Sequence, residues 1–255
     1  ISDLVAYYPM EGTSLDQEGI YHGTDTNVEY NYNGTASNVT YQEATNFSPD
    51  LVWLKGRSDA EGSRWFDVIR GANKAIFSNS TGQETTVSGE LTSLDSNGFT
   101  LGSNENVNQS SQTYAAWCFN AGTDAAASNT DGSITSTVKA NQDAGFSIVS
   151  YTGEINSGSS GVDTVGHGLS AVPELVIIKD RDAAQPWAVY HKSISTGGDA
   201  ILLNDSAAKT TPTNSNDYWG NGMTSSAIGI GDSGRVNRNN EDYIAYVFHS
   251  VDGIQ

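Results

Sequence analysis

The sequence of 255 residues predicts an all-β fold built from two tandem antiparallel β-sandwich units. Three observations support this prediction. An internal repeat divides the chain into two similar halves, short apolar segments with strand character recur in each half, and residues typical of tight turns separate these segments. Many short strands spaced by turns are typical of sandwiches and jelly rolls, and about 100 residues suffice for one such unit.

The repeat is defined by matches that occur in the same order in both halves. Residues 49–57 (PDLVWLKGR) match residues 173–181 (PELVIIKDR), and residues 114–119 (YAAWCF) match residues 243–248 (YIAYVF). Between these segments, Trp65 is matched with Trp187. So many ordered matches are not expected by chance. They predict an N-terminal strand segment at residues 1–27, sandwich units at residues 28–122 and 145–255, and a linker with a connecting strand at residues 123–144.

Strand signals dominate the local sequence, and helix signals are weak. Residues 146–151 alternate between apolar and polar side chains, as a strand with one buried face does. The pair Asn221-Gly222 tolerates the positive φ angles of a tight turn. Only residues 67–72 and 124–127 could hold a helical turn or two, which is shorter than a stable helix.

The charge balance excludes one class of partner. The chain has 30 Asp and Glu against 12 Lys and Arg, which gives a net charge of −18 and a pI of about 4.3. Nonspecific nucleic-acid binding needs clustered basic residues, so nucleic acid is not expected as a partner.

No window holds the roughly 18 consecutive apolar residues of a membrane span, so membrane insertion is not expected. The single cysteine, Cys118, lies in an apolar aromatic run, where we expect a buried, inert thiol.

Patterns for catalysis or metal binding are weak. The four histidines are scattered without the spacing of a metal site. The neighbouring acids Glu241 and Asp242 have the residue types of a glycosidase pair, but adjacent carboxylates along a strand usually are solvated surface. We therefore expect a protein that is not an enzyme and holds no cofactor.

The loops before the two aromatic strands are the strongest candidates for ligand binding. They carry amides and carboxylates near Tyr or Trp, the chemistry that binds sugar hydroxyls by hydrogen bonds and ring stacking. Oxygen-rich loops of this kind could instead hold Ca²⁺, or their polar side chains could satisfy the loop backbone. An exposed Trp219 would suit ligand stacking, whereas a buried one would fill the end of a sandwich. The candidate ligand-binding residues are Asn104, Asn106, Asn108, Trp219, Asn237 and Asn239.

Two pairs of basic residues recur at the same place in this acidic chain. Lys55 and Arg57 end the first matched segment of one half, and Lys179 and Arg181 end its counterpart in the other. On an extended strand each pair projects to one face. We expect these side chains to pair with acids of the neighbouring unit or of another subunit, or to protect an edge strand from aggregation.

The ordered motifs resemble a domain family that recurs in virion proteins of marine tailed bacteriophages, including cyanophage tail-fibre-like proteins. The family's motifs correspond to residues 49–57, residues 66–72 (FDVIRGA), residues 98–102 (GFTLG) and residues 114–119. The second half keeps the first, third and last motifs but has residues 190–195 (YHKSIS) in place of the second, which puts any role of that segment in doubt there. The resemblance covers residues 28–250 and implies a virion protein.

The first residues resemble a different fold type. Residues 4–12 (LVAYYPMEG), with Leu15, Asp16 and residues 21–24, are similar to the first strands of laminin-G or concanavalin-like jelly rolls in phage adhesins. This stretch is too short for a whole domain of that kind. We expect it to form a strand at the edge of a sheet.

The resemblance and the polar loops lead to hypotheses from different classes. The first is a non-enzymatic tail-fibre or appendage module of a virion, extracellular in its action, that binds a host-surface glycan or protein. The alternative is a capsid or tail decoration or fibre-shaft protein that contacts only other virion subunits. A polysaccharide depolymerase is a weaker third hypothesis. The sequence leaves homo-oligomerisation open.

Overall fold

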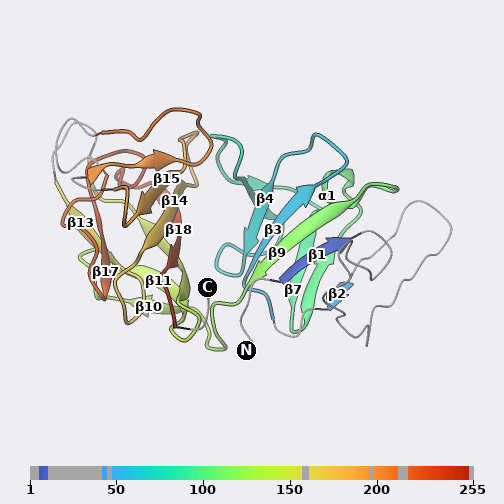
Figure 1. Cartoon of the computed structure of the whole chain (residues 1–255), viewed down its shortest axis with the longest axis horizontal. Coiled ribbons are helices and arrows are strands. Elements are labelled where there is room, and N and C mark those ends of the chain that lie inside the picture. The colour runs from blue at the N-terminus through green and yellow to red at the C-terminus, as the bar shows by residue number, and fades with distance from the viewer. Residues whose placement is uncertain are drawn as a thin grey trace. The chain divides into compact units, whose positions relative to one another are not determined.

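The chain folds into two compact units that are almost entirely β, as predicted (Figure 1). Unit 1 contains Ile1–Phe77 and Thr85–Asn120, and unit 2 contains Ser78–Glu84 and Ala121–Gln255. The computed structural model describes the backbone of residues 6–10 and 42–44, and both backbone and side chains of residues 48–156, 161–195, 198–211 and 218–252.

Unit 1 is built from two antiparallel sheets. Its strands are β1 (Ala6–Met10), β2 (Gln42–Ala44), β3 (Leu51–Gly56), β4 (Arg64–Asp67), β5 (Lys74–Phe77), β6 (Thr85–Thr86), β7 (Leu91–Asp95), β8 (Gly98–Leu101) and β9 (Tyr114–Phe119). The larger sheet has the order β1-β9-β3-β4-β5-β6, and the smaller has the order β2-β8-β7. Figure 1 shows β1 running beside β9.

The core of unit 1 joins these two sheets. Val52 and Leu54 from β3 and Phe66 from β4 pack in one cluster with Leu91 from β7 and Phe99 from β8. All five side chains are at most 2% exposed. Because successive side chains of a strand point to opposite faces, the alternation in β3 buries Val52 and Leu54 on the face that meets the smaller sheet.

Unit 2 repeats this architecture. Its strands are β10 (Ala127–Asn129), β11 (Ser136–Asn141), β12 (Phe146–Thr152), β13 (Asp163–Gly166), β14 (Leu175–Asp180), β15 (Ala188–His191), β16 (Ile201–Leu202), β17 (Ala227–Ile230) and β18 (Asp242–Phe248). The larger sheet has the order β10-β11-β12-β18-β14-β15-β16, and β13 pairs with β17 in the smaller one.

The core of unit 2 is likewise shared by its two sheets. Val149, Val176 and Ala245 from the larger sheet cluster with Val165 and Ile228 from the smaller sheet. All five are fully buried. Each unit is therefore a sandwich whose apolar side chains meet between two antiparallel layers.

Strand register confirms the internal repeat. Leu51 lies opposite Phe119 at one end of the β3–β9 pair, and Leu175 lies opposite Phe248 at the same end of the β14–β18 pair. One matched pair of residues is wrong, because β4 places Trp65 opposite Trp53, whereas in unit 2 the residue opposite Ile177 is Val189 and not Trp187.

The structure moves two predicted boundaries. Strand β1 was assigned to a segment outside the repeat, but Met10 lies opposite Tyr114 on β9 just as Tyr151 lies opposite Tyr243 on β18. Strand β1 therefore holds the place of β12 in unit 1, at the sheet edge as expected, while Leu15, Asp16 and residues 21–24 lie outside the described residues. Residues 123–144 contain the predicted strand as β11, but they are part of unit 2 and not a separate linker, since β10 and β11 extend its larger sheet.

Among the described residues the single α-helix is α1 (Glu105–Asn108), which the sequence prediction treated as loop. The Asn104 side chain caps it by accepting a hydrogen bond from the Asn106 N–H. The two weak helix candidates, residues 67–72 and 124–127, form turns, bends and strand ends instead. No helix in the described ranges has the length and apolar character needed to cross a bilayer.

A buried ion pair organises the turn after β4, within the FDVIRGA segment. The Arg70 side chain donates to the Asp67 carboxylate and to the carbonyls of Trp65 and Lys74 (2.9 and 2.8 Å). Asp67 Oδ1 accepts from the Ile69 and Arg70 backbone N–H groups, and both charged side chains are fully buried. The segment therefore has a structural role in unit 1.

Unit 2 closes the equivalent turn without that ion pair. His191 holds the position of Asp67, and its N–H donates to Ser195 Oγ at 3.0 Å. The Ser195 N–H in turn donates to the His191 carbonyl at 2.8 Å. Residues 190–195, which replace the FDVIRGA segment in the second half, thus change the contacts that hold the turn and leave the strand pairing intact.

Candidate functional site

A tyrosine at the start of the last strand holds the preceding loop in each unit. In unit 2 the Tyr243 hydroxyl donates to the Gly234 carbonyl (2.9 Å) and accepts from the Arg238 N–H (2.8 Å). Burial raises the pKa of Tyr243, which keeps the phenol protonated and able to donate.

Unit 1 contains the same arrangement at the matching positions. The Tyr114 hydroxyl donates to the Glu105 carbonyl (3.2 Å) and accepts from the Gln109 N–H (2.9 Å). Burial raises the pKa of Tyr114 as well. The two polar loops singled out in the sequence are therefore each fixed by a tyrosine of the strand that follows.

Replacing Tyr243 with phenylalanine is expected to lower the free energy of unfolding by about 1–3 kcal/mol, because a partly buried N–H and a partly buried carbonyl lose their partner. Urea unfolding followed by tryptophan fluorescence measures this loss. Tyr114→Phe serves as the matched change in unit 1 and should also destabilise. A Tyr243→Phe protein as stable as the wild type would contradict this role for the hydroxyl.

The predicted ligand-binding amides of unit 1 are used by the fold. Asn104 caps α1, and its amide nitrogen reaches the Ser88 carbonyl at 3.4 Å. Asn106 donates to the buried Glu90 carboxylate (3.2 Å), and Asn108 donates to the Gly102 carbonyl (2.8 Å). Their polar atoms hold the loop, as the alternative interpretation of the sequence proposed.

The amides of unit 2 behave in the same way. Asn237 is fully buried, accepting from the Glu154 N–H (2.9 Å) and donating to Asp163 (3.0 Å). Asn239 donates to the Asn156 side chain at 2.9 Å. The expectation that this loop exposes its amides to a ligand is wrong for Asn237, because the closing of the loop over β12 and β13 encloses the side chain.

Trp219 is buried, so it cannot stack on a ligand in this structure. Its side chain is 4% exposed and packs edge-on against Tyr190, with 5.7 Å between ring centroids. In unit 1 the Gly102 N–H donates to the Glu90 carbonyl, and in unit 2 the Gly231 N–H donates to the Tyr218 carbonyl. Leu91, a core residue of unit 1, follows Glu90, and Trp219 follows Tyr218. Trp219 therefore takes the position of Leu91 and is a core residue of unit 2.

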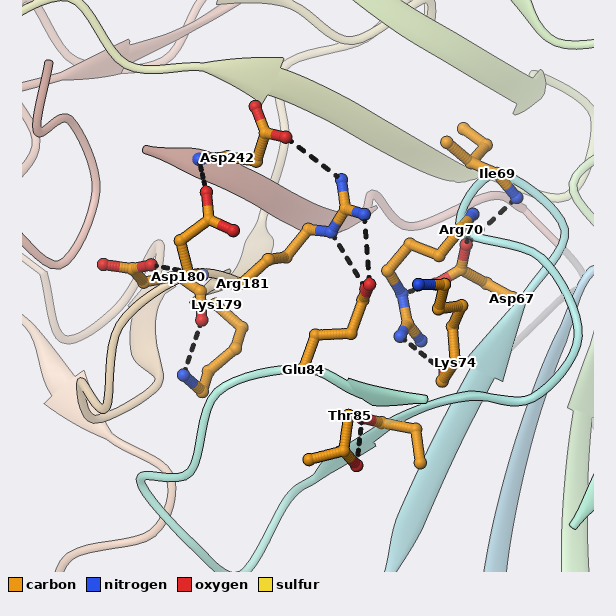
Figure 2. A network of polar contacts seen from close by, with 12 residues as sticks. Asp67, Ile69, Arg70, Lys74, Glu84, Thr85, Lys179, Asp180, Arg181 and Asp242 are labelled. Atoms are coloured by element: carbon orange, nitrogen blue, oxygen red, sulfur yellow. Dashed lines mark hydrogen bonds and ion pairs between the residues drawn. The ribbon is translucent and has the colours of Figure 1, made fainter. Parts of the chain in front are cut away.

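The site with the clearest binding geometry is centred on Arg181, at the end of β14 (Figure 2). Its guanidinium donates to both carboxylate oxygens of Glu84 (3.0 and 3.3 Å), and its carbonyl accepts from the Glu84 N–H at 2.9 Å. A third nitrogen lies 4.0 Å from the Asp242 carboxylate. Glu84 ends the connector between β5 and β6, residues 78–84, all of which group with unit 2.

This geometry combines a bidentate ion pair with a backbone hydrogen bond. The two side chains are 20% and 11% exposed, so solvent screens the pair less than it screens a surface salt bridge. Arg181 therefore holds the end of the β5–β6 connector through both the side chain and the backbone of Glu84. Arg181 thus pairs with an acid, but Glu84 groups with the unit of Arg181 itself and not with the neighbouring unit that the sequence analysis expected.

The recurring lysines bind the loops that follow their own strands. Lys179 donates to the carbonyls of Asp180 (2.6 Å) and Ala183 (3.3 Å), and Lys55 donates to those of Gly56 (2.5 Å) and Glu61 (2.9 Å). Burial lowers the pKa of Lys179 to about 8 because desolvation disfavours its charge. Both lysines thus position the loop that carries the neighbouring arginine.

His167 is another buried titratable group of unit 2. Its Nδ1 accepts from the Leu169 N–H (3.1 Å), and Nε2 lies 3.2 Å from the Thr224 carbonyl, which fixes a neutral ring with the proton on Nε2. Burial lowers the pKa of His167 below its usual value near 6.5. The unfolded chain therefore takes up this proton more readily than the folded chain does.

From this linkage, His167 is expected to make the protein less stable as the pH falls below about 6.5, with a slope of at most roughly 1.4 kcal/mol per pH unit. Urea unfolding at pH 7.5 and pH 5.0 measures the effect. The loss is compared with that of His167→Gln, which carries no titrating ring at this position and in which the loss should shrink. An equal loss in both proteins would contradict the assignment.

The neighbouring acids Glu241 and Asp242, which have the residue types of a glycosidase pair, are ordinary surface groups. Asp242 accepts from the Thr152 hydroxyl at 2.7 Å, and Glu241 lies 3.9 Å from Arg238. No group of three His, Cys, Asp or Glu side chains in the described part of the chain has metal-ligand geometry. Cys118 is buried, as expected.

Fold and site together define a protein of two related antiparallel sandwiches, each with a tyrosine-anchored polar loop. The chain belongs to the DUF7483 family, a domain of unknown function, whose model matches residues 23–255. The match covers unit 2 and all of unit 1 from residue 23 onward. Searches among curated proteins and solved structures found no match.

Proposed function

We propose that the chain is a non-catalytic structural module of a bacteriophage virion whose contacts are with other protein subunits. The sequence motifs resemble virion proteins, and this resemblance supports the virion as its location. The observation that carries the choice of partner is the Arg181 site, in which Arg181 holds the chain's own connector through the Glu84 side chain and the Glu84 backbone N–H.

The geometry favours this function over binding of a host glycan. Asn237 and Trp219, two of the residues proposed to bind sugar, are buried, and the side chains of the four other asparagines hydrogen-bond to groups of the protein itself. Host attachment stays a prediction of the sequence. If it is correct, it uses surfaces of the module other than these six residues.

The location of the module in the particle tests the proposal. Cryo-electron microscopy of purified virions should place the two sandwiches at contacts between subunits of the capsid, tail or fibre shaft. A glycan array and a whole-cell adsorption assay with the isolated protein should both be negative. A distal position at a fibre tip together with glycan or cell binding would replace this proposal with the adhesin hypothesis, and absence from the particle would overturn both.

A further inference from the structure

Two turns of unit 2 are closed by histidine rings that accept hydrogen bonds from the backbone. His167 directly follows β13, and its Nδ1 accepts from the Leu169 N–H at 3.1 Å. His191 ends β15, and its Nδ1 accepts from the Ser193 N–H at 3.2 Å. In both turns the acceptor is therefore an imidazole nitrogen, and the donor is the backbone N–H two residues further along the chain.

Unit 1 closes the turn that corresponds to His191 with a carboxylate. Asp67 holds the position of His191, and its Oδ1 accepts from the Ile69 N–H at 3.0 Å. Carboxylates ordinarily take up a proton only near about pH 4, whereas histidine changes its charge between about pH 5 and 8. The two units therefore close this turn with acceptors that respond to different ranges of pH.

The ring of His167 accepts this hydrogen bond only while it is neutral, because a protonated imidazole carries a hydrogen on both nitrogens. Burial lowers the pKa of His167, and the neighbouring His249 lowers it further, whereas the contact with the Thr224 carbonyl and the charge of Asp131 raise it by less. Leu169 is 3% exposed and belongs to the core of unit 2. A proton on Nδ1 therefore requires the ring to leave the turn or the turn to move away from the core.

The turn that His191 closes lies at the surface of unit 2. Lys192 follows the histidine and pairs with Glu174 at 2.6 Å, so these two charges balance one another. Ile194 in the same turn is 38% exposed. The ring of His191 can therefore exchange protons with solvent, and its protonation removes the acceptor of the Ser193 N–H.

We propose that the turns after β13 and β15 form an acid-sensitive switch, which opens these turns of unit 2 as the pH falls through the range of histidine while the matching turn of unit 1 stays closed. This inference goes beyond the proposed function and does not depend on where the module lies in a particle. It also goes beyond the loss of global stability expected from His167, because it assigns the opening to two particular turns.

Amide hydrogen exchange measured by NMR at pH 7.5 and pH 5.5 tests the switch. The observed rate of each amide is compared with its intrinsic rate at the same pH, which gives a protection factor. The protection factors of Leu169 and Ser193 should fall by about tenfold, because the open turn takes up a histidine proton that the closed turn excludes. The protection factor of Ile69 should change by less than about twofold, since its acceptor is a carboxylate.

The variant His191→Asp gives the turn after β15 the acceptor that Asp67 provides in unit 1. The protection factor of Ser193 should then stay constant between the two pH values, while that of Leu169 should still fall. Three results would overturn the proposal: protection of Leu169 and Ser193 that does not depend on pH, an equal fall at Ile69, or a fall at Ser193 that survives His191→Asp.

The wild-type protein offers a second measurement if the His191→Asp protein fails to fold. The ¹⁵N chemical shifts of the imidazole nitrogens distinguish a nitrogen that carries a proton from one that does not. At pH 7.5 the Nδ1 atoms of His167 and His191 should both be without a proton, as their hydrogen bonds require. A proton on either Nδ1 at this pH would overturn the proposal, because the ring could not then be the acceptor.

Discussion

Replacing Trp219 with alanine is expected to lower the free energy of unfolding by about 3–5 kcal/mol, the usual range for removing a buried tryptophan. The side chain is 4% exposed and lies in the core cluster of unit 2 beside Tyr190 and Tyr218. Its removal opens a cavity that the surrounding strands cannot fill without moving. Equilibrium unfolding in urea, followed by circular dichroism, measures the change.

Trp219→Phe is the matched control for this change. Phenylalanine keeps most of the apolar volume and removes the indole N–H, which is buried without a hydrogen-bond partner within the described residues. The loss should therefore be clearly smaller than for alanine. A Trp219→Ala protein of wild-type stability would show that the side chain is not a core residue and would reopen its role in ligand stacking.

Replacing Arg70 with methionine is expected to lower the free energy of unfolding by about 3–5 kcal/mol, because it leaves the Asp67 carboxylate buried without its cation. The carbonyls of Trp65 and Lys74 lose a donor at the same time. Urea unfolding again provides the measurement.

The double variant Asp67→Asn/Arg70→Met separates the ion pair from the packing. It removes both charges, so it should recover most of the lost stability. Lys192→Met, at the exposed ion pair with Glu174, is the surface control and should change stability by no more than about 1 kcal/mol. A single Arg70→Met change of that small size would contradict the structural role of the ion pair.

The repeat and the strands could be predicted because their signals are local. A segment such as residues 49–57 combines β-branched and aromatic residues with bounding Pro and charge, and a strand needs little more to be recognised. Matching such segments between the halves also predicted which strands correspond, since β3 and β14 take the same place in their sheets. The Trp65–Trp187 match was wrong by two positions because register depends on the pairing of β4 and β15, which identity between single residues does not fix.

The candidate site could be predicted only in part. The sequence drew attention to the two polar loops and to the recurring arginines, and the structure gives both a role. The sequence could not show that Asn237 would be buried, because the partners of its amide, Glu154 and Asp163, lie far away in the chain. Helix α1 was missed although Asn104 followed by Glu105 is a capping signal, because a single turn is too short to show a helical period.

The sequence by itself determined that this protein consists of two related β units, where their strands lie, and that its loops are polar and its charge strongly negative. The tertiary structure alone decided that the loop amides hydrogen-bond to other groups of the protein, that Trp219 belongs to the core, and that Arg181 is the arginine covered by Glu84. The physical reason is that composition and alternation act over a few neighbouring residues, whereas burial and hydrogen-bond partners depend on which distant segments the sheets bring together.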